Sequence, residues 1–356
     1  MSVTASPVLD RLDELRATVA AADAVVPVGA RTHWEVGNPA AGGVEVRAPA
    51  GIVAYDPAEL TVTAGAGTTV AELAAVLGDA GQESPLDPRD ATATVGGVVA
   101  TGLSGPRRLR YGPLRDRVLE VRFVTADGRL VKGGGPTVKN VTGYDVPRLL
   151  VGSLGTIGVL VQVTLRCQPR ARFARWFTST ADPFDARRRM FRPSCVAWDG
   201  ATTRVLLEGH PDDVAAEASA AGLDPGAGVD AVLADAGPPW PDGPHRGRIS
   251  VRPSRLREVA PALDGIDGLR WLAEVGVGTV HVAAADPDGL VAARRVAAAH
   301  GGWLLREAGA PHVDGYGGPP PNLAILERIR AAFDPTGKLS PGRLPGEPAP
   351  AAPSAR

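Results

Sequence analysis

The sequence predicts a mixed α+β protein of two domains that meet near residue 170. Its 356 residues are enough for about two domains of ordinary size. Strand-like and helix-like apolar patterns occur in both halves, which favours an α+β class. No glycine lies between Gly158 and Gly200 and arginines accumulate over 169–175, after which the chain alternates strand and helix patterns. We therefore expect domains at 1–170 and 171–321, a C-terminal helix and closing segment at 322–344, and a disordered tail at 345–356.

The first half begins with an amphipathic helix over 7–22 and continues with short strands. Thr69 and Glu72 form a capping-box pattern, which predicts a helix that starts there and buries Val70, Leu73, Val76 and Leu77. Two apolar runs joined at Asp127-Gly128 predict a hairpin over 118–132. The remaining predicted strands of this half are Ala24–Val28, Val44–Arg47, Gly51–Tyr55, Leu60–Ala64 and Val159–Cys167.

The second half reads as strands and helices in an order that resembles a small ferredoxin-like substrate or cap domain. The predicted strands are 204–208, 248–252, 271–275 and 279–283, and the predicted helices are 211–221, 254–263 and 287–300. The region 222–246 reads as a loop, and a final helix is expected over 322–333.

Composition excludes several classes of protein. The net charge of −1 provides no basic surface for nucleic acid. Two cysteines are too few for a disulfide framework and too isolated for a metal site, which fits a reduced, cytoplasmic setting. The charged N-terminus lacks the apolar stretch of a secretory signal. The uncharged run Leu149–Leu165 approaches a membrane span in length, but its glycines favour a turn followed by a buried strand.

Common catalytic motifs are absent from the sequence. Gly65-Ala66-Gly67 begins like a dinucleotide fingerprint, yet Val70 stands at the third glycine position. Gly133–Gly135 lacks the lysine of a P-loop, and no H-E-x-x-H or G-x-S-x-G occurs. No metal site is expected.

The segment Pro85–Gly102 has small residues at nearly every position. Such a chain can lay successive backbone amides against a pyrophosphate, which makes it a candidate anion-binding nest. Tight packing of a helix on a strand would demand the same residues, so the segment alone leaves both interpretations open.

The order of the glycine-rich segments decides between them. The succession resembles, from end to end, the FAD-binding domain of the vanillyl-alcohol-oxidase (PCMH-type) family. The segments that carry the resemblance are Pro27–Gly37, Val95–Gly105, Arg110–Gly112, Lys139–Asp145, Gly152–Val159 and, more weakly, Phe333–Arg343.

The resemblance implies a PCMH-type domain of two α/β subdomains that binds FAD noncovalently, followed by a cap. Within the family, the run ending at Asp145 and the short cap are similar to FAD-binding subunits of bacterial glycolate oxidases. This implies hydride transfer from a small 2-hydroxy acid to the flavin, beside a second flavin subunit and an iron–sulfur subunit. Any membrane association would come through those partners. A stand-alone oxidase or dehydrogenase of another alcohol or sugar acid, and a non-catalytic assembly subunit, remain alternatives.

Site residues follow from the resemblance position by position. Arg31 either pairs with phosphate or is a surface residue, because the usual Arg-Gly-Gly-Gly run is interrupted. His33 is expected not to bind FAD covalently, and His281 is expected to be structural. No catalytic base is assigned. The expected cofactor contacts are Gly29, Arg31, Thr32, His33, Pro88, Thr94, Gly96, Gly97, Thr101, Gly102, Ser104, Arg110, Tyr111, Gly155, Thr156, Ile157 and Val159.

Each of four further polar residues has two possible roles. Lys139, Tyr144 and Asp145 either orient a ligand or fix their loop, and a structural role is favoured for Asp145. Arg343 is either a clasp on the cofactor domain or an exposed tail residue.

Overall fold

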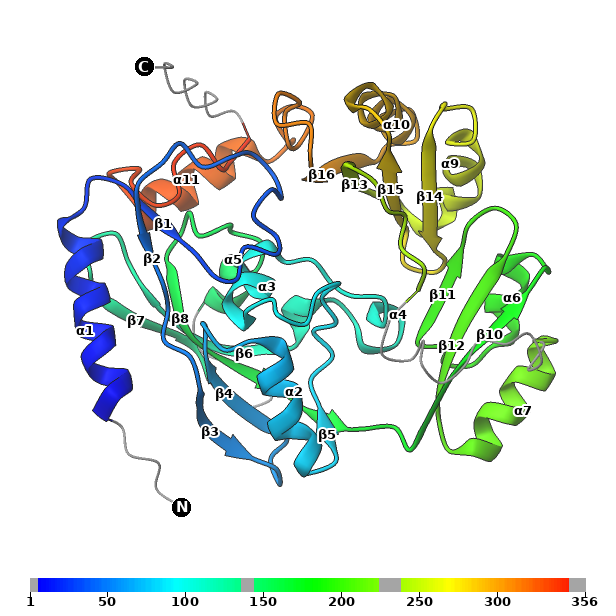
Figure 1. Ribbon diagram of the computed structural model, residues 1–356, viewed down its shortest axis with the longest axis horizontal. Helices are drawn as coiled ribbons and strands as arrows, with labels where there is room; N and C mark the ends of the chain where they lie inside the picture. Colours follow the sequence, from blue (N-terminus) through cyan, green and yellow to red (C-terminus); the bar gives the residue numbers. More distant parts are fainter. Residues whose placement is uncertain (1–5, 136–143, 224–237, 346–356) are drawn as a thin grey trace.

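The computed structural model describes residues 6–135, 144–223 and 238–345, and for residues 6–10 it describes the backbone only. Two bodies face each other across the centre of the molecule, one holding both ends of the described chain and the other formed by the middle of the sequence (Figure 1). Both contain helices and strands, as predicted. The predicted tail and Lys139 lie outside the described residues, as does much of the predicted loop over 222–246.

The first body has two layers, and one apolar cluster contains side chains of both. Strand β1 (Val25–Pro27) pairs in parallel with β2 (Val44–Val46), and helix α1 (Ser6–Ala21) packs beside them. A buried apolar cluster joins α1 to these strands through Leu12, Leu15 and Val19. This arrangement provides one α/β subdomain.

The second layer is a five-stranded antiparallel sheet in the order β3-β4-β8-β6-β7. Its core contains side chains of two covering helices, such as Leu73 and Val98. A small pair of strands, β5 and β9, leads towards the second body. The elements are β3 (Ile52–Asp56), β4 (Thr61–Gly65), α2 (Val70–Asp79), β5 (Gln82–Glu83), α3 (Val95–Thr101), α4 (Arg108–Tyr111), a 3-10 turn (Leu114–Asp116), β6 (Val118–Val124), β7 (Leu130–Gly134), α5 (Val146–Leu150), β8 (Val159–Arg166) and β9 (Gln168–Pro169).

Local sequence signals place several of these elements correctly. The Thr69 hydroxyl accepts from the Glu72 amide, and the Glu72 carboxylate accepts from the Thr69 amide, so the predicted capping box starts α2. Leu73 and Leu77 are buried as expected, but Val76 is 36% exposed, so its predicted burial is wrong. Helix α2 therefore contributes only a narrow face to the core, and Leu73 and Leu77 form that face.

The second body is a seven-stranded antiparallel sheet in the order β10-β12-β11-β14-β15-β13-β16. Four strands were predicted, and β10, β11 and β16 were missed. Its elements are β10 (Phe173–Ser179), α6 (Pro183–Arg189), β11 (Cys195–Trp198), β12 (Thr203–Gly209), α7 (Pro211–Ala221), β13 (His245–Ser250), a 3-10 turn (Pro253–Arg255), α9 (Leu256–Ala262), β14 (Leu269–Glu274), β15 (Thr279–Ala284), α10 (Pro287–Ala299) and β16 (Trp303–Ala308).

The sheet consists of two related halves. The unit from β13 to β16 has the β-α-β-β-α-β order of a ferredoxin-like fold, and its strands lie in the order β14-β15-β13-β16. The unit from β10 to α7 repeats the first three strands and both helices of that plan. The two second strands, β11 and β14, pair with each other and join the halves.

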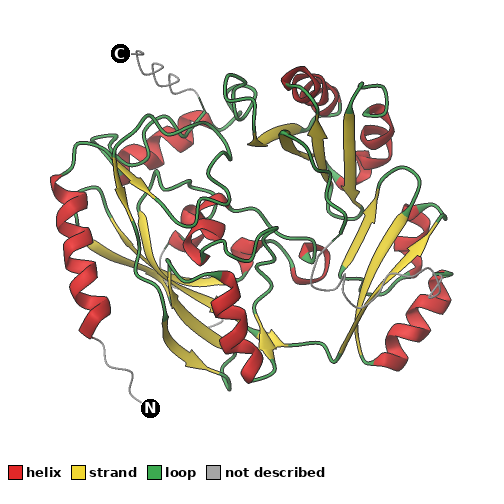
Figure 2. Ribbon diagram, viewed as in Figure 1, coloured by secondary structure: helices red, strands yellow, loops and turns green. Residues whose placement is uncertain are grey.

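The helices cover only one face of this sheet (Figure 2). A large apolar core lies under them, whereas the opposite face carries a small cluster around Trp176, Cys195 and Leu272. Charged side chains such as Arg248, Glu274 and Glu307 also lie on that opposite face. This face is turned towards the first body (Figure 1). We call it the inner face of the cap.

The C-terminal part of the described chain returns to the first body. Helix α11 (Leu323–Phe333) places Phe333 against Phe123 of β6, with ring centroids 6.1 Å apart. Leu339 then bridges to Val25 of β1, and Lys338 donates to carbonyl groups at the end of α1. The cap is therefore inserted between two parts of one body.

The uncharged run Leu149–Leu165 is divided among the end of α5, a turn and strand β8. Across the described residues, no helix has both the length and the apolar character needed to cross a membrane.

Candidate functional site

The segment that follows β1 presents unused backbone amides. The amides of residues 29–33 have no hydrogen-bond acceptor among the described residues. Arg31 adopts a left-handed conformation with φ of 63°, which reverses the chain direction within the loop. Successive free amides around a left-handed residue form a concavity suited to an anion.

Thr94 and the start of α3 form the opposite wall. A Cβ on Gly29 would lie 2.3 Å from the Thr94 hydroxyl oxygen, so the loop backbone touches this wall directly. The predicted nest at this wall is not formed by the helix amides. Those of Val95 and Gly96 donate to the carbonyls of Thr68 and Ala66, and that of Gly97 donates to the Thr94 hydroxyl. The free donors lie across the groove instead.

The turn at Leu154 and Gly155 closes the groove. Both residues have positive φ, and a Cβ on Gly155 would lie 2.9 Å from the Ser340 hydroxyl. Two adjoining hollows of about 80 and 70 Å³ run between the three walls. Ten of the predicted contacts line them: Gly29, Arg31, Thr32, His33, Thr94, Gly96, Gly97, Thr101, Gly155 and Val159.

These residues fit the phosphate part of FAD. Each hollow has the volume of two or three water molecules at about 30 Å³ each, which suits phosphate groups but not a fused ring. The donors are main-chain amides, and glycines leave them uncovered.

Two side chains of the loop have defined partners. The Arg31 guanidinium pairs with Glu45 of β2 and stacks on Trp34, so it is already engaged within the protein. The Thr32 hydroxyl lies 3.1 Å from Nδ1 of His33. Burial lowers the pKa of His33, with Glu307 raising it and Arg248 and Arg89 lowering it further. His33 is thus a neutral imidazole at the end of the groove that faces the cap.

Seven predicted contacts lie outside the groove. Thr156 and Ile157 are buried and line a different, largely apolar cavity beside α11. Gly102 ends α3 in a left-handed conformation. Ser104 caps the amide of Leu114, and Pro88 lines a cavity between the two bodies. Arg110 and Tyr111 are in the same region, beside β12.

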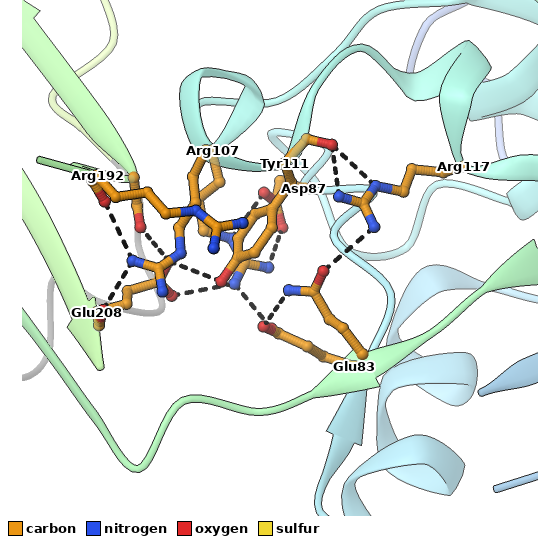
Figure 3. A network of polar contacts seen from close by, with 10 residues as sticks. Glu83, Asp87, Arg107, Tyr111, Arg117, Arg192 and Glu208 are labelled. Atoms are coloured by element: carbon orange, nitrogen blue, oxygen red, sulfur yellow. Dashed lines mark hydrogen bonds and ion pairs between the residues drawn. The ribbon is translucent and has the colours of Figure 1, made fainter. Parts of the chain in front are cut away.

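Arg110 and Tyr111 belong to a polar network that joins the two bodies (Figure 3). Arg107 is its centre: it binds Asp87 through two hydrogen bonds of 2.8 and 2.6 Å and reaches Glu83 at 2.7 Å. Glu208 of the cap accepts from Arg107 at 3.2 Å and from the Tyr111 hydroxyl at 3.2 Å. Burial, followed by the charges of Glu208 and Glu83, raises the pKa of Tyr111 to about 12. These groups fix the cap on the first body.

A second polar cluster lies on the inner face of the cap. Arg89, from the first body, places Nη2 3.2 Å from Nδ1 of His281 and 3.8 Å from Glu307. The Nε2 atom of His281 lies 3.2 Å from Glu274, and Arg248 binds Glu307 at 2.9 Å. We call these five residues the cap cluster.

Burial controls the protonation of the cap cluster. It lowers the pKa of His281 well below the ordinary range and raises the pKa of Glu274 to about 7. Burial alone would raise the pKa of Glu307, but the positive charges of Arg248 and Arg89 outweigh it, so this pKa is lowered. His281 is consequently neutral beside two carboxyl groups of different acidity.

Sequence reasoning missed four members of the cap cluster and assigned His281 to structure. The four are single charged residues that come from a loop and three separate strands, so no spacing connects them. The alternation of polar and apolar residues in β13 and β15 was the one available signal, since it places Arg248 and His281 on the same face of the sheet.

Several other predicted residues have structural positions. Asp145 caps α5 by accepting from the Arg148 amide, in line with its favoured role. Tyr144 is 90% exposed. Arg343 is 6% exposed and donates to the carbonyls of Trp34 and Val36, so it is a clasp on the groove loop.

Comparison with known proteins identifies the first body. Residues 8–134 match the family model described as an FAD binding domain. Over these residues the chain is similar to a PCMH-type FAD binding domain. The resemblance predicted from the glycine-rich segments is confirmed, and the FAD binding domain contains the 29–33 loop and Thr94.

The relatives of the FAD binding domain include subunits of glycolate oxidase. The chain is 41% identical over 164 residues to glycolate oxidase subunit GlcE of Escherichia coli, covering 45% of this chain and 47% of that protein. It is 44% identical over 108 residues to a D-lactate dehydrogenase of Archaeoglobus fulgidus, covering 30% and 24%, respectively. Glycolate oxidase subunit GlcD of Bacillus subtilis is 31% identical over 136 residues, covering 38% and 29%. The matched part spans about half or less of each relative.

A solved structure of alkyldihydroxyacetonephosphate synthase shares the fold of nearly the whole chain. It superposes with a TM-score of 0.65 over 93% of this chain and 76% of that one, at 13% identity. The mixed α/β fold with an FAD binding domain is therefore confirmed.

Proposed function

We propose that this chain is the FAD-binding subunit of an oxidoreductase that acts on small 2-hydroxy acids such as glycolate. The observation that carries the proposal is the row of free amides at residues 29–33, which lies in an FAD binding domain and opens towards a charged cap. The relatives named as glycolate oxidase subunits and D-lactate dehydrogenases support this substrate class.

The residues of the chain divide the work between cofactor and substrate. The amides of 29–33 hold the pyrophosphate noncovalently, and the hydroxyl of Thr94 and the glycines around it shape the groove. These residues would hold FAD, which would supply the chemistry of a hydride acceptor for the substrate α-carbon. His33 has no hydrogen-bond partner at Nε2 among the described residues and is neutral, so it is positioned to accept the hydroxyl proton.

The chain works beside other subunits in this proposal. Relatives bear the names of two different glycolate oxidase subunits, GlcE and GlcD, which supports a sister flavoprotein as partner. An iron–sulfur subunit would then carry electrons away from the flavins.

The test begins with the purified full-length chain and its visible spectrum. We expect a flavin spectrum that acid denaturation releases into solution, as noncovalent FAD requires. Glycolate added without oxygen should bleach the flavin. Bleaching only after a sister flavoprotein is added would assign the chemistry to the complex. A colourless chain that does not take up added FAD would refute the proposal.

A further inference from the structure

We propose that Arg343 binds the phosphate groups of FAD together with the free amides of residues 29–33. The inference rests on the proposed function, because it adds a contact to the cofactor assigned there. The contact comes from the C-terminal segment (residues 339–345), which lies outside the residues matched by the family model.

The C-terminal segment carries Arg343 back to the groove. Ser340 donates its amide to the Val25 carbonyl at the start of β1, and the segment turns through positive φ at Ser340 and Gly342, of 46° and 85°. The hydroxyl of Tyr316 donates to the Arg343 carbonyl at 3.2 Å. The backbone of Arg343 is therefore fixed on both sides.

One nitrogen of the Arg343 guanidinium is used within the protein, and two are available. Nη1 donates to the carbonyls of Trp34 and Val36 at 2.9 and 3.0 Å, which uses both of its protons. Nε and Nη2 share one edge of the planar group, and neither has an acceptor among the described residues. Neither atom is fully buried. Two donors on one edge match two oxygens of a phosphate.

The positive charge of Arg343 is not neutralised within the described chain. The side chain is 6% exposed and pairs with no described carboxylate. Burial lowers its pKa, Tyr316 raises it, and Arg306 lowers it further. Arg31, in contrast, already pairs with Glu45. Since a buried charge without a counter-ion is unfavourable, a phosphate would supply the anion that Arg343 lacks.

Arg343 and the free-amide loop line the same hollow, which has a volume of about 80 Å³. None of the described residues that line it is acidic. Arg306 is also buried and donates to carbonyls, but it does not line this hollow. The hollow therefore combines main-chain donors with one uncompensated cation, which is the composition of an anion site.

Trp34 joins Arg343 to the free-amide loop. The centre of its ring lies 4.3 Å from the guanidinium carbon of Arg31 and 4.8 Å from that of Arg343. Its amide donates to the Arg31 carbonyl at 3.1 Å. A phosphate bound to Arg343 should therefore change the fluorescence of Trp34.

Inorganic pyrophosphate is the first probe, because it carries phosphate charge without the rings of the cofactor. The full-length chain, freed of flavin, is titrated with pyrophosphate while tryptophan fluorescence is followed, and then with FAD. Arg343→Gln should weaken the binding of both about 10- to 100-fold, the cost of losing charge-assisted hydrogen bonds. Arg343→Lys should recover part of the affinity. Riboflavin, which has no phosphate, should bind wild type and Arg343→Gln equally.

Lys338→Met is the matched control, because Lys338 belongs to the same returning chain and donates only to main-chain carbonyls at the end of α1. It should change FAD affinity less than about threefold. Added salt should weaken FAD binding in wild type and Lys338→Met, and distinctly less in Arg343→Gln, because salt screens the charge that this variant has lost.

Two results would overturn the proposal. Equal weakening by Lys338→Met and Arg343→Gln, with the salt dependence of wild type in both, would mean that the C-terminal segment only supports the loop. A larger loss of pyrophosphate affinity in Arg31→Gln than in Arg343→Gln would assign the phosphate charge to Arg31 instead.

FAD uptake is measured on every preparation, which separates this inference from the proposed function. Pyrophosphate binding that depends on Arg343 in a chain that takes up no FAD would support the anion site and refute the flavoprotein assignment. Normal FAD uptake with an affinity that does not depend on Arg343 would refute this inference alone.

Discussion

The cofactor groove and the cap cluster differ in the groups that interact with charge, which are main-chain amides in the groove and ionisable side chains in the cluster. The groove is built from the main chain, with free amides at 29–33 and glycines that touch Thr94. The cap cluster is built from side chains, where Arg89, Arg248 and Glu307 stand in close contact with the buried pair His281 and Glu274. Backbone amides do not titrate. Each member of the cap cluster either has a shifted pKa or contacts a residue whose pKa is shifted.

This difference separates binding that is insensitive to pH from binding that responds to it. A groove of amides holds phosphate equally well over a wide pH range. A cluster of coupled side chains changes its net charge when one proton enters or leaves. The two regions should therefore respond differently to mutation and to pH.

The largest effect should come from the joint between the two regions. Arg107→Met leaves Asp87, Glu83 and Glu208 without their shared cation, and Arg107 is only 16% exposed. We expect a loss of about 3–5 kcal/mol in the free energy of unfolding, measured with urea, because unpaired carboxylates stay buried.

Arg129→Met serves as the control for the Arg107 experiment. Arg129 pairs with Asp127 at 2.6 Å but is 75% exposed, so its removal should change stability by less than about 0.5 kcal/mol. If Arg107→Met were as stable as this control, the network would not hold the cap in place.

A methyl group in the groove should be the next largest effect. In Gly29→Ala the new Cβ lies 2.3 Å from the Thr94 hydroxyl oxygen, which forces the loop and the wall apart. We expect the Kd for FAD to rise about 100-fold, roughly 2.7 kcal/mol, by fluorescence titration. Gly78→Ala in α2 meets no atom within 4 Å and should leave FAD affinity unchanged. Wild-type affinity in Gly29→Ala would show that the cofactor lies elsewhere.

The cap cluster should have a smaller effect, which is a pH dependence of the free energy of unfolding. Burial raises the pKa of Glu274 from 4.5 to about 7, so the folded state binds this proton more tightly than the unfolded chain does. Its contribution to stability is complete below about pH 4.5 and is lost as pH rises through 7. Glu274→Gln should remove this slope in urea unfolding measured at several pH values.

His281 provides the internal contrast for the Glu274 experiment. Its pKa is lowered, so its contribution is complete above about pH 6.5 and is lost as pH falls. The acid-side loss should therefore persist in Glu274→Gln. An unchanged slope between pH 4.5 and 7 would mean that Glu274 does not titrate there.

The two regions also differ in how well the sequence predicts them. The groove follows from glycines and small residues in a fixed order, because exposed amides exclude side chains. The two predicted stretches differ in the structure: the amides at Val95–Gly97 are used internally, which favours the packing interpretation there, and those at 29–33 have no acceptor among the described residues. The cap cluster depends on strand register and could not be found from spacing.

The missed strands have a similar physical cause. Strand β16 contains Arg306, which is 2% exposed and donates to the carbonyls of Gly309 and Gly37. A charge inside a buried strand looks like a loop residue until its acceptors are known. Strand β11 has only four residues, and β10 follows a cluster of arginines that resembles a linker. The longer helices were placed accurately because their caps lie within the same short stretch of sequence, whereas the short helices α3, α4, α5 and α6 were not predicted.

The groove can be completed only after the C-terminal segment that returns to it has been synthesised. Ser340 stands next to Gly155, and Arg343 grips the carbonyls that follow the 29–33 loop. During synthesis these contacts form only after the whole cap has left the ribosome. A nascent chain therefore has an unfinished groove until the cap and residues 340–343 have been synthesised, so under the proposed function FAD can be held firmly only after the cap is complete.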